Sequence, residues 1–88
     1  MGFVLMEISD DLADRQQLEE KTGAYVSFID NGSAAQQSQL RTGDVILNVD
    51  GKAIRSIDDA KEAFTANKKE YLLQVSRARA QFYLLLKP

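Results

Sequence analysis

The residue types that carry out most enzyme chemistry are missing from this 88-residue sequence, which contains no histidine and no cysteine. A thiolate nucleophile, a Ser-His-Asp arrangement, a Cys/His zinc site and a disulfide framework are therefore excluded. Asp10, Asp11 and Asp14 could suggest a cation site, but they lack the glycine and terminal glutamate of a calcium loop, which favours a solvated helix start. No pair of acids has a spacing that argues for carboxylate catalysis. We predict no catalytic residue, no metal and no cofactor.

The composition is that of one small globular domain spanning residues 1–88, with 44% hydrophobic and 27% charged residues. The formal net charge of -2 gives no electrostatic reason to expect a nucleic acid or an anionic membrane as partner. No apolar run approaches the roughly 20 residues that span a bilayer, so we expect no membrane insertion. The apolar start, residues 1–6, has no basic region and stops at Glu7, too early for a signal peptide.

Apolar periodicity and turn residues divide the chain into short elements without a linker or repeat. We predict strands at 3–8, 24–29, 44–49, 70–76 and 81–86, a short extended piece at 52–54, and helices at 10–18, 34–40 and 57–67. Along 70–76, Tyr71, Leu73 and Val75 share one face. The economical fold is α+β, mostly β: a small, partly open antiparallel barrel or sandwich of about five strands, capped by two or three short helices.

The helix that starts at Ile57 has the clearest signals. Ser56 can cap it, acidic residues occupy its first turn, and Ile57, Ala60 and Phe64 fall on one face at helical spacing. Small alanines on that face would let the helix lie close to a sheet. Such a face belongs to a protein core more often than to a binding groove, and Phe64 can serve both.

A set of short motifs, most of them containing glycine, follows in order along the middle of the chain: Gly32-Ser33-Ala34-Ala35, Leu40, Gly43-Asp44-Val45-Ile46 and Val49-Asp50-Gly51-Lys52. This set resembles the central signature of bacterial PDZ domains, and Met1-Gly2-Phe3-Val4 resembles the Φ-G-Φ loop that binds carboxylates in that family. Glu7-Ile8-Ser9 with Leu12-Ala13, and the ending 82–86, are similar to PDZ domains of the HtrA (Do-like) serine proteases. The resemblance implies a single PDZ domain in the permuted order of bacteria.

A PDZ groove takes the end of another polypeptide as an extra strand, with the ligand's carboxylate held by backbone N–H groups. By resemblance, the carboxylate loop and strand edge comprise Met1, Gly2, Phe3, Val4, Leu5 and Met6, and the opposing helix contributes Ile57, Lys61 and Phe64. Ile57 would meet the ligand side chain two before the terminus, and an isoleucine there favours an apolar ligand residue. Lys61 either covers the pocket, assists the carboxylate or is simply solvated.

The family also implies a partner and a location. The expected ligands are C-terminal or unfolded hydrophobic segments, and neighbouring protease or PDZ domains of the same parent protein are expected as further partners. The parent would be a periplasmic HtrA-like protease, which this module would regulate or supply with substrates. The alternative is a scaffold PDZ domain of another membrane-associated protease, of site-2 or C-terminal-processing type, or of a secretion component.

The sequence departs from the family pattern before Leu40, where Ser38 and Gln39 replace the usual small residue and glycine. The sequence therefore leaves open how the chain leaves the predicted helix at 34–40, because glycine is the residue that favours a left-handed cap at a helix end. Arg77 and Arg79 alternate with alanines and are interpreted as a solubilising edge. We further predict that Gly2→Val weakens ligand binding with almost no change in melting temperature.

Overall fold

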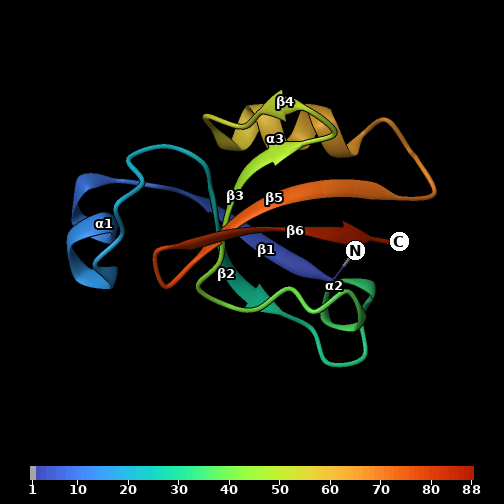
Figure 1. Cartoon of the computed structure of the whole chain (residues 1–88), viewed down its shortest axis with the longest axis horizontal. Coiled ribbons are helices and arrows are strands. Elements are labelled where there is room, and N and C mark those ends of the chain that lie inside the picture. Colours follow the sequence, from blue (N-terminus) through green and yellow to red (C-terminus); the bar gives the residue numbers. More distant parts are fainter. Residues whose placement is uncertain (1) are drawn as a thin grey trace.

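The computed structural model describes residues 2–88, which form six strands and three short helices (Figure 1). In chain order these are β1 (Phe3–Glu7), α1 (Asp10–Gln16), β2 (Ala24–Ile29), α2 (Ala34–Gln37), β3 (Val45–Val49), β4 (Lys52–Ala53), α3 (Ile57–Phe64), β5 (Tyr71–Arg77) and β6 (Ala80–Leu86). None of the helices in residues 2–88 has the length and apolar character to cross a membrane.

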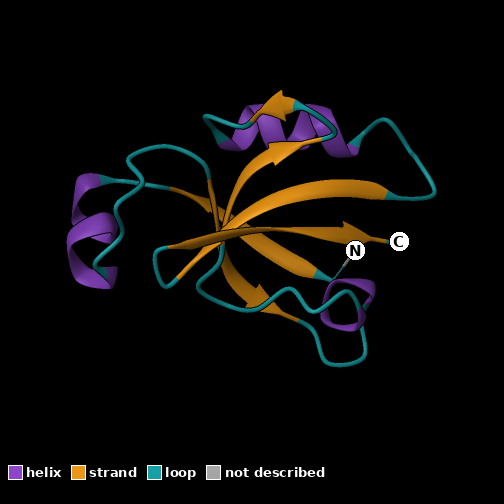
Figure 2. Cartoon of the chain, in the orientation of Figure 1, coloured by secondary structure: helices purple, strands orange, loops and turns teal. Residues whose placement is uncertain are grey.

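The strands form one antiparallel, open sheet in the order β1-β2-β3-β5-β6, and β4 pairs with β3. Figure 2 shows the helices at the periphery of the crossing strands, with α1 and α2 at opposite ends and α3 along one side. This arrangement confirms the predicted mostly-β fold with short capping helices. The sixth strand, β4, corresponds to the short extended piece that the sequence predicted at residues 52–54.

The core lies between the inner face of the sheet, α3 and the loop around α2. Its largest fully buried side chains include Tyr71, Ile46, Leu73 and Leu86. The predicted inward face of β5 is confirmed, since Tyr71, Leu73 and Val75 are all buried. Alternation fails at Ser76, which is also buried and donates its hydroxyl hydrogen to Glu20 Oε2 at 3.1 Å.

The helices end earlier than predicted. For α3 the end is Phe64 rather than residue 67, and α2 stops at Gln37. Gln39 then adopts a φ of 71°, so the chain takes the left-handed turn without a glycine. Leu40 N–H donates to Ala35 O at 3.2 Å and closes the helix end. The chain therefore leaves α2 through a left-handed turn, and Gln39 is tolerated at the position where the family has glycine.

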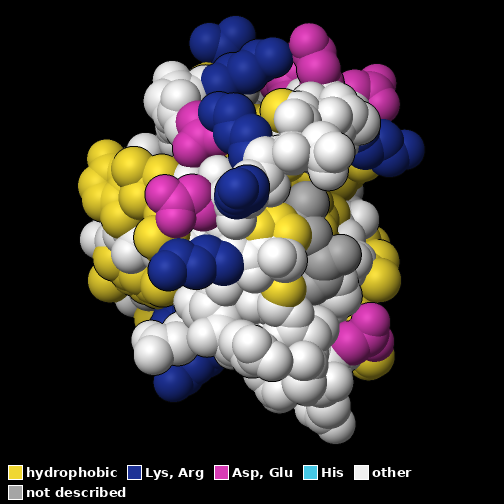
Figure 3. Space-filling model, turned by 90° about the vertical axis from the view of Figure 1, so that its right-hand side faces the viewer, with side chains coloured by type: hydrophobic (Ala, Val, Ile, Leu, Met, Phe, Trp, Pro, Cys, Tyr) yellow, Lys and Arg dark blue, Asp and Glu magenta, His cyan; other side chains and the backbone are white. Residues whose placement is uncertain are grey.

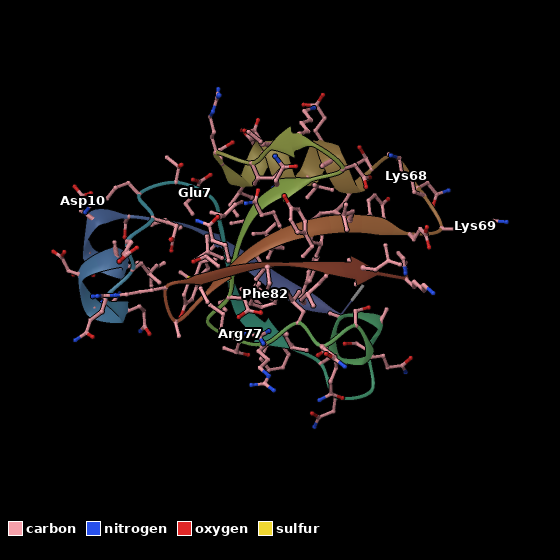
Figure 4. All side chains as sticks on the ribbon, in the orientation of Figure 1. Glu7, Asp10, Lys68, Lys69, Arg77 and Phe82 are labelled. Carbon is pink, nitrogen blue, oxygen red and sulfur yellow. The ribbon has the colours of Figure 1, made fainter. Side chains whose placement is uncertain are left out.

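The prediction of a solubilising edge was wrong for Arg77. Its Nε and Nη2 donate to the two carboxylate oxygens of Asp44, each at 2.7 Å, and Asp44 is only 1% exposed. The guanidinium also lies 4.7 Å from the ring centroid of Phe82 (Figure 4). Asp44 accepts a further bond from Arg41 N, so this carboxylate ties the loop after α2 to the end of β5. The side-chain hydrogen bonds to Asp44, helped by its negative charge, raise the pKa of Arg77 above its usual value.

Candidate functional site

The open edge of β1 runs alongside α3. Strand β1 pairs only with β2 among the described residues, so its other edge carries no strand partner. One end of the space between β1 and α3 is fixed by Phe3 and Phe64, whose ring centroids are 5.5 Å apart. The other end is fixed by Ile57 N, which donates to Glu7 Oε1 at 2.6 Å. The strand and the helix therefore run in opposite directions and form the two walls of a groove.

Within this groove lies a shallow pocket of about 240 Å³. It is lined by Phe3 and Leu5 from the strand and by Ile57, Ala60, Lys61 and Phe64 from the helix. Four other hollows, of about 260 to 480 Å³, are larger, but none of them is lined by a residue of β1. Only the smaller, apolar one adjoins the open edge of β1, which makes it the candidate binding site in the described structure.

Local sequence explains the position of α3. Ser56 Oγ accepts from Asp59 N at 3.1 Å and caps the helix start. Ala60 is 1% exposed, so the helix approaches the sheet through a side chain with no bulk beyond Cβ. At the other end Tyr71 Oη donates to Phe64 O, and the two rings contact each other edge-on with centroids 5.1 Å apart. Phe64 thus belongs to both core and groove, as the sequence allowed.

The segment before β1 is held against α2. Gly2 O accepts from Asp30 N at 2.8 Å, and Gly2 has a φ of +87°, in the region that favours glycine. A Cβ at Gly2 would overlap Ser33 Cβ, the residue that caps α2. The expected unchanged melting temperature of Gly2→Val is therefore wrong: a valine would displace this loop as well as strain it.

The structure brings together five of the nine predicted site residues around one pocket: Phe3, Leu5, Ile57, Lys61 and Phe64. Val4 and Met6 alternate with them and are 52% and 45% exposed on the opposite face of β1, so their side chains do not line the pocket. The backbone oxygen of Val4 accepts from Ser27 Oγ of β2 at 3.1 Å, on the paired side of β1. Gly2 lies in the preceding loop, and Met1 lies outside the described residues.

Sequence reasoning missed two residues of this site. Ala60 was placed on the helix face, but its contribution to the pocket lining was not predicted. Glu7 was predicted to end an apolar run and to belong to a segment that resembles HtrA domains, but its contact with the first N–H group of α3 was not predicted. No motif marks this contact. The position of Glu7 two residues after Leu5, on the same side of the strand, was the available signal.

Lysines gather towards the end of α3, where the helix continues into the loop before β5. Figure 3 faces this end of the molecule and shows Lys and Arg side chains across its upper half and centre. Lys68 Nζ pairs with Asp50 Oδ2 at 2.9 Å, and Leu72 N donates to the other oxygen of Asp50. The bond from Leu72, followed by that from Lys68, lowers the pKa of Asp50 below its usual value.

Comparison with known proteins places this geometry in a family. The family model described as "PDZ domain" matches residues 1–76, which is most of the chain. The chain is 41% identical over 54 residues to a probable periplasmic serine endoprotease DegP-like from Pseudomonas fulva (strain 12-X). It is 34% identical over 65 residues to the protein of that name from Chlamydia trachomatis serovar D. These matches cover 61% and 74% of the chain but only 11% and 13% of the relatives.

Solved structures agree with this result. The PDZ domain of HtrA3, bound to a phage-derived ligand (FGRWV), matches the whole chain and 82% of its own length with a TM-score of 0.87 at 25% identity. The HtrA-type protease AlgW with a decapeptide matches 98% of this chain and 27% of its own, with a TM-score of 0.82. At 23% identity, the second likeness shows the fold alone.

The open strand edge, the apolar pocket beside α3, and the family match over residues 1–76 lead to one conclusion. This chain belongs to the PDZ domain family and is similar to the PDZ domains of HtrA-type serine proteases.

Proposed function

We propose that this domain binds the C-terminal ends of other polypeptides, or unfolded hydrophobic segments, by adding them as a strand to β1. The observation that carries the proposal is the unpaired edge of β1 facing α3 across an apolar pocket. A strand added there would pair its backbone with β1 and place alternate side chains against α3. Burial of the ligand on two sides favours binding, and the five apolar lining residues favour apolar ligand side chains.

The terminal carboxylate would lie next to Gly2. A positive φ at this position and the tie to Asp30 shape a tight turn just before the strand edge. Backbone N–H groups at such a turn can hold an anion. The PDZ domain of HtrA3, which is similar over the whole length of this chain, holds a ligand that ends in valine, an apolar residue.

Within a longer protein, this module would regulate an HtrA-like serine protease or deliver substrates to it in the periplasm. Support for this role comes from the curated relatives, which are named periplasmic serine endoproteases. The chain spans about a tenth of their length, so the catalytic activity would reside in another domain.

An NMR titration with an acetylated peptide that ends in a free valine tests the proposed site. We expect the largest amide shifts at residues 2–7 of β1 and its preceding turn and at the residues of α3. The outer strand β6 should change little, because it lies at the opposite end of the sheet order. Shifts confined to β5 and β6, or the absence of shifts at millimolar peptide, would contradict the proposal.

A further inference from the structure

The groove has an acidic end, where α3 begins. Glu7 is the last residue of β1 and shares the strand face of Phe3 and Leu5. Its Oε1 accepts from Ile57 N, which places the carboxylate between the two walls of the groove. No donor among residues 2–88 forms a hydrogen bond with Oε2, and Glu7 is exposed. One oxygen therefore caps the helix, and the other remains open to a bound ligand.

The pairing register determines which ligand residue meets Glu7. A ligand whose carboxylate lies near Gly2 must run antiparallel to β1, so its last residue, position 0, lies beside Phe3. Side chains alternate along a strand, so position −2 lies beside Leu5 and position −4 beside Glu7. From Phe3 to Glu7 the strand covers about 14 Å, whereas α3 covers about 11 Å from Phe64 to Ile57. Position −4 is thus the first inward-facing position beyond the apolar pocket.

Charged residues of both signs lie near each end of the groove: Arg55 precedes α3 at the Glu7 end, and Lys68 at the other end is paired with Asp50. Asp58, in the first turn of α3, and Asp10, at the start of α1, add to the acidic end. Lys61 lines the pocket towards the other end, and Lys68 and Lys69 follow α3. Figure 4 shows Glu7 and Asp10 towards one end of the long axis of the molecule and Lys68 and Lys69 at the other. The open carboxylate oxygen of Glu7, rather than a gradient of charge, is therefore the feature that a cation at position −4 would meet.

We propose that Glu7 makes this domain select ligands with a lysine or arginine at position −4, four residues before the C-terminal residue. The inference rests on the proposed function, since the register is set by the carboxylate near Gly2. Glu7 acts as a specificity determinant that pairs with the ligand cation through Oε2. The bond from Ile57 N to Oε1 holds the carboxylate in place for this contact.

The test uses acetylated eight-residue peptides with a free C-terminal valine, identical except for lysine, alanine or glutamate at position −4. A fourth peptide carries the lysine at position −3, whose side chain points away from α3. We expect lysine at −4 to bind about two- to fivefold more tightly than alanine at low salt, as befits an exposed ion pair, and glutamate to bind more weakly. Lysine at −3 should give no gain.

Protein variants separate the ligand contact from the helix cap. Glu7→Gln retains an oxygen that can accept from Ile57 N but removes the charge, so the ratio of affinities for the lysine and alanine peptides should fall to about one. Glu7→Lys should reverse the preference towards glutamate. Equal affinity of the wild-type domain for all three residues at −4, with the free acid still preferred over the amide, would overturn the role of Glu7 alone. Equal affinity for acid and amide would overturn the proposed function as well.

Discussion

The groove and the outer face of the β5–β6 hairpin both expose apolar side chains, but they differ in how these side chains are flanked. In the groove, Phe3, Leu5, Ile57 and Phe64 are partly buried between a strand edge and a helix. On the hairpin, Leu72, Tyr83 and Leu85 are 45%, 65% and 42% exposed on one face of the sheet. Figure 3 shows apolar side chains gathered at its left edge, the side that faces the viewer in Figure 1.

The difference shows why exposure alone does not define a binding site. A ligand on the hairpin face would be covered on one side, whereas a strand in the groove would be covered by β1 backbone and by α3. The hairpin is also internally complete: all seven residues of β5 pair with β6, and Arg77 joins it to the buried Asp44. We therefore expect substitutions around the hairpin to change stability and substitutions in the groove to change binding.

The largest effect should come from removing the buried charge at Asp44. Asp44→Asn leaves Arg77 without its ionic partner in a site where Asp44 is almost inaccessible, so we expect a loss of about 3 kcal/mol in the free energy of unfolding. Urea denaturation at pH 7 measures this loss. Glu19→Gln is the matched control, because its pair with Arg79 is exposed and should contribute less than about 0.5 kcal/mol. Similar losses for the two variants would show that Asp44 does not stabilise the hairpin.

A groove substitution gives the next effect. Ile57→Ala removes apolar contact from the pocket, so we expect about tenfold weaker binding of a valine-ended peptide, measured by fluorescence anisotropy. Leu85→Ala removes an exposed apolar side chain from the hairpin face and serves as the control, with unchanged affinity. If both variants weakened binding equally, the groove would not be the specific site.

The smallest effect concerns Asp50, whose pKa is lowered in the folded state by Leu72 N–H and Lys68. A lowered pKa means that the carboxylate stabilises the fold above its unfolded-state pKa and loses this contribution as pH falls through the folded-state pKa. Asp50→Asn should therefore be less stable than the wild type at pH 6, by about 1 kcal/mol or less, and the difference should shrink towards pH 2.5. Urea unfolding across this range measures it, and a constant difference would contradict the assigned cause.

The sequence was sufficient for the fold because the signals that position the elements are local. Ser56 caps its helix as predicted, Ser33 caps α2 in the same way, and the alternation of Tyr71, Leu73 and Val75 identifies the inner face of β5. Helix ends were less predictable, since Gln39 adopts a left-handed conformation through tertiary context rather than by residue preference. The hairpin turn likewise has positive φ at Ala78 and Arg79 without a glycine.

The candidate site was predictable only in part, because its key contacts join residues far apart in the sequence. The alternation of side chains along a strand places Phe3 and Leu5 on one face and Val4 and Met6 on the other. The structure shows this arrangement, with only Phe3 and Leu5 lining the pocket. The bond from Ile57 to Glu7 spans 50 residues, and the pair of Arg77 with Asp44 spans 33. No residue type or local spacing predicts either contact, because both depend on the tertiary arrangement of the strands and helices.

The most direct test of the central claim compares one valine-ended peptide in two forms, with a free carboxylate and with a C-terminal amide. Binding is followed through the backbone amides of residues 2–7 by NMR and quantified by anisotropy. We expect the free acid to bind at least about tenfold more tightly, because the amide loses charge-assisted hydrogen bonds near Gly2. Equal affinity of the two forms would contradict the capture of a polypeptide end by this groove.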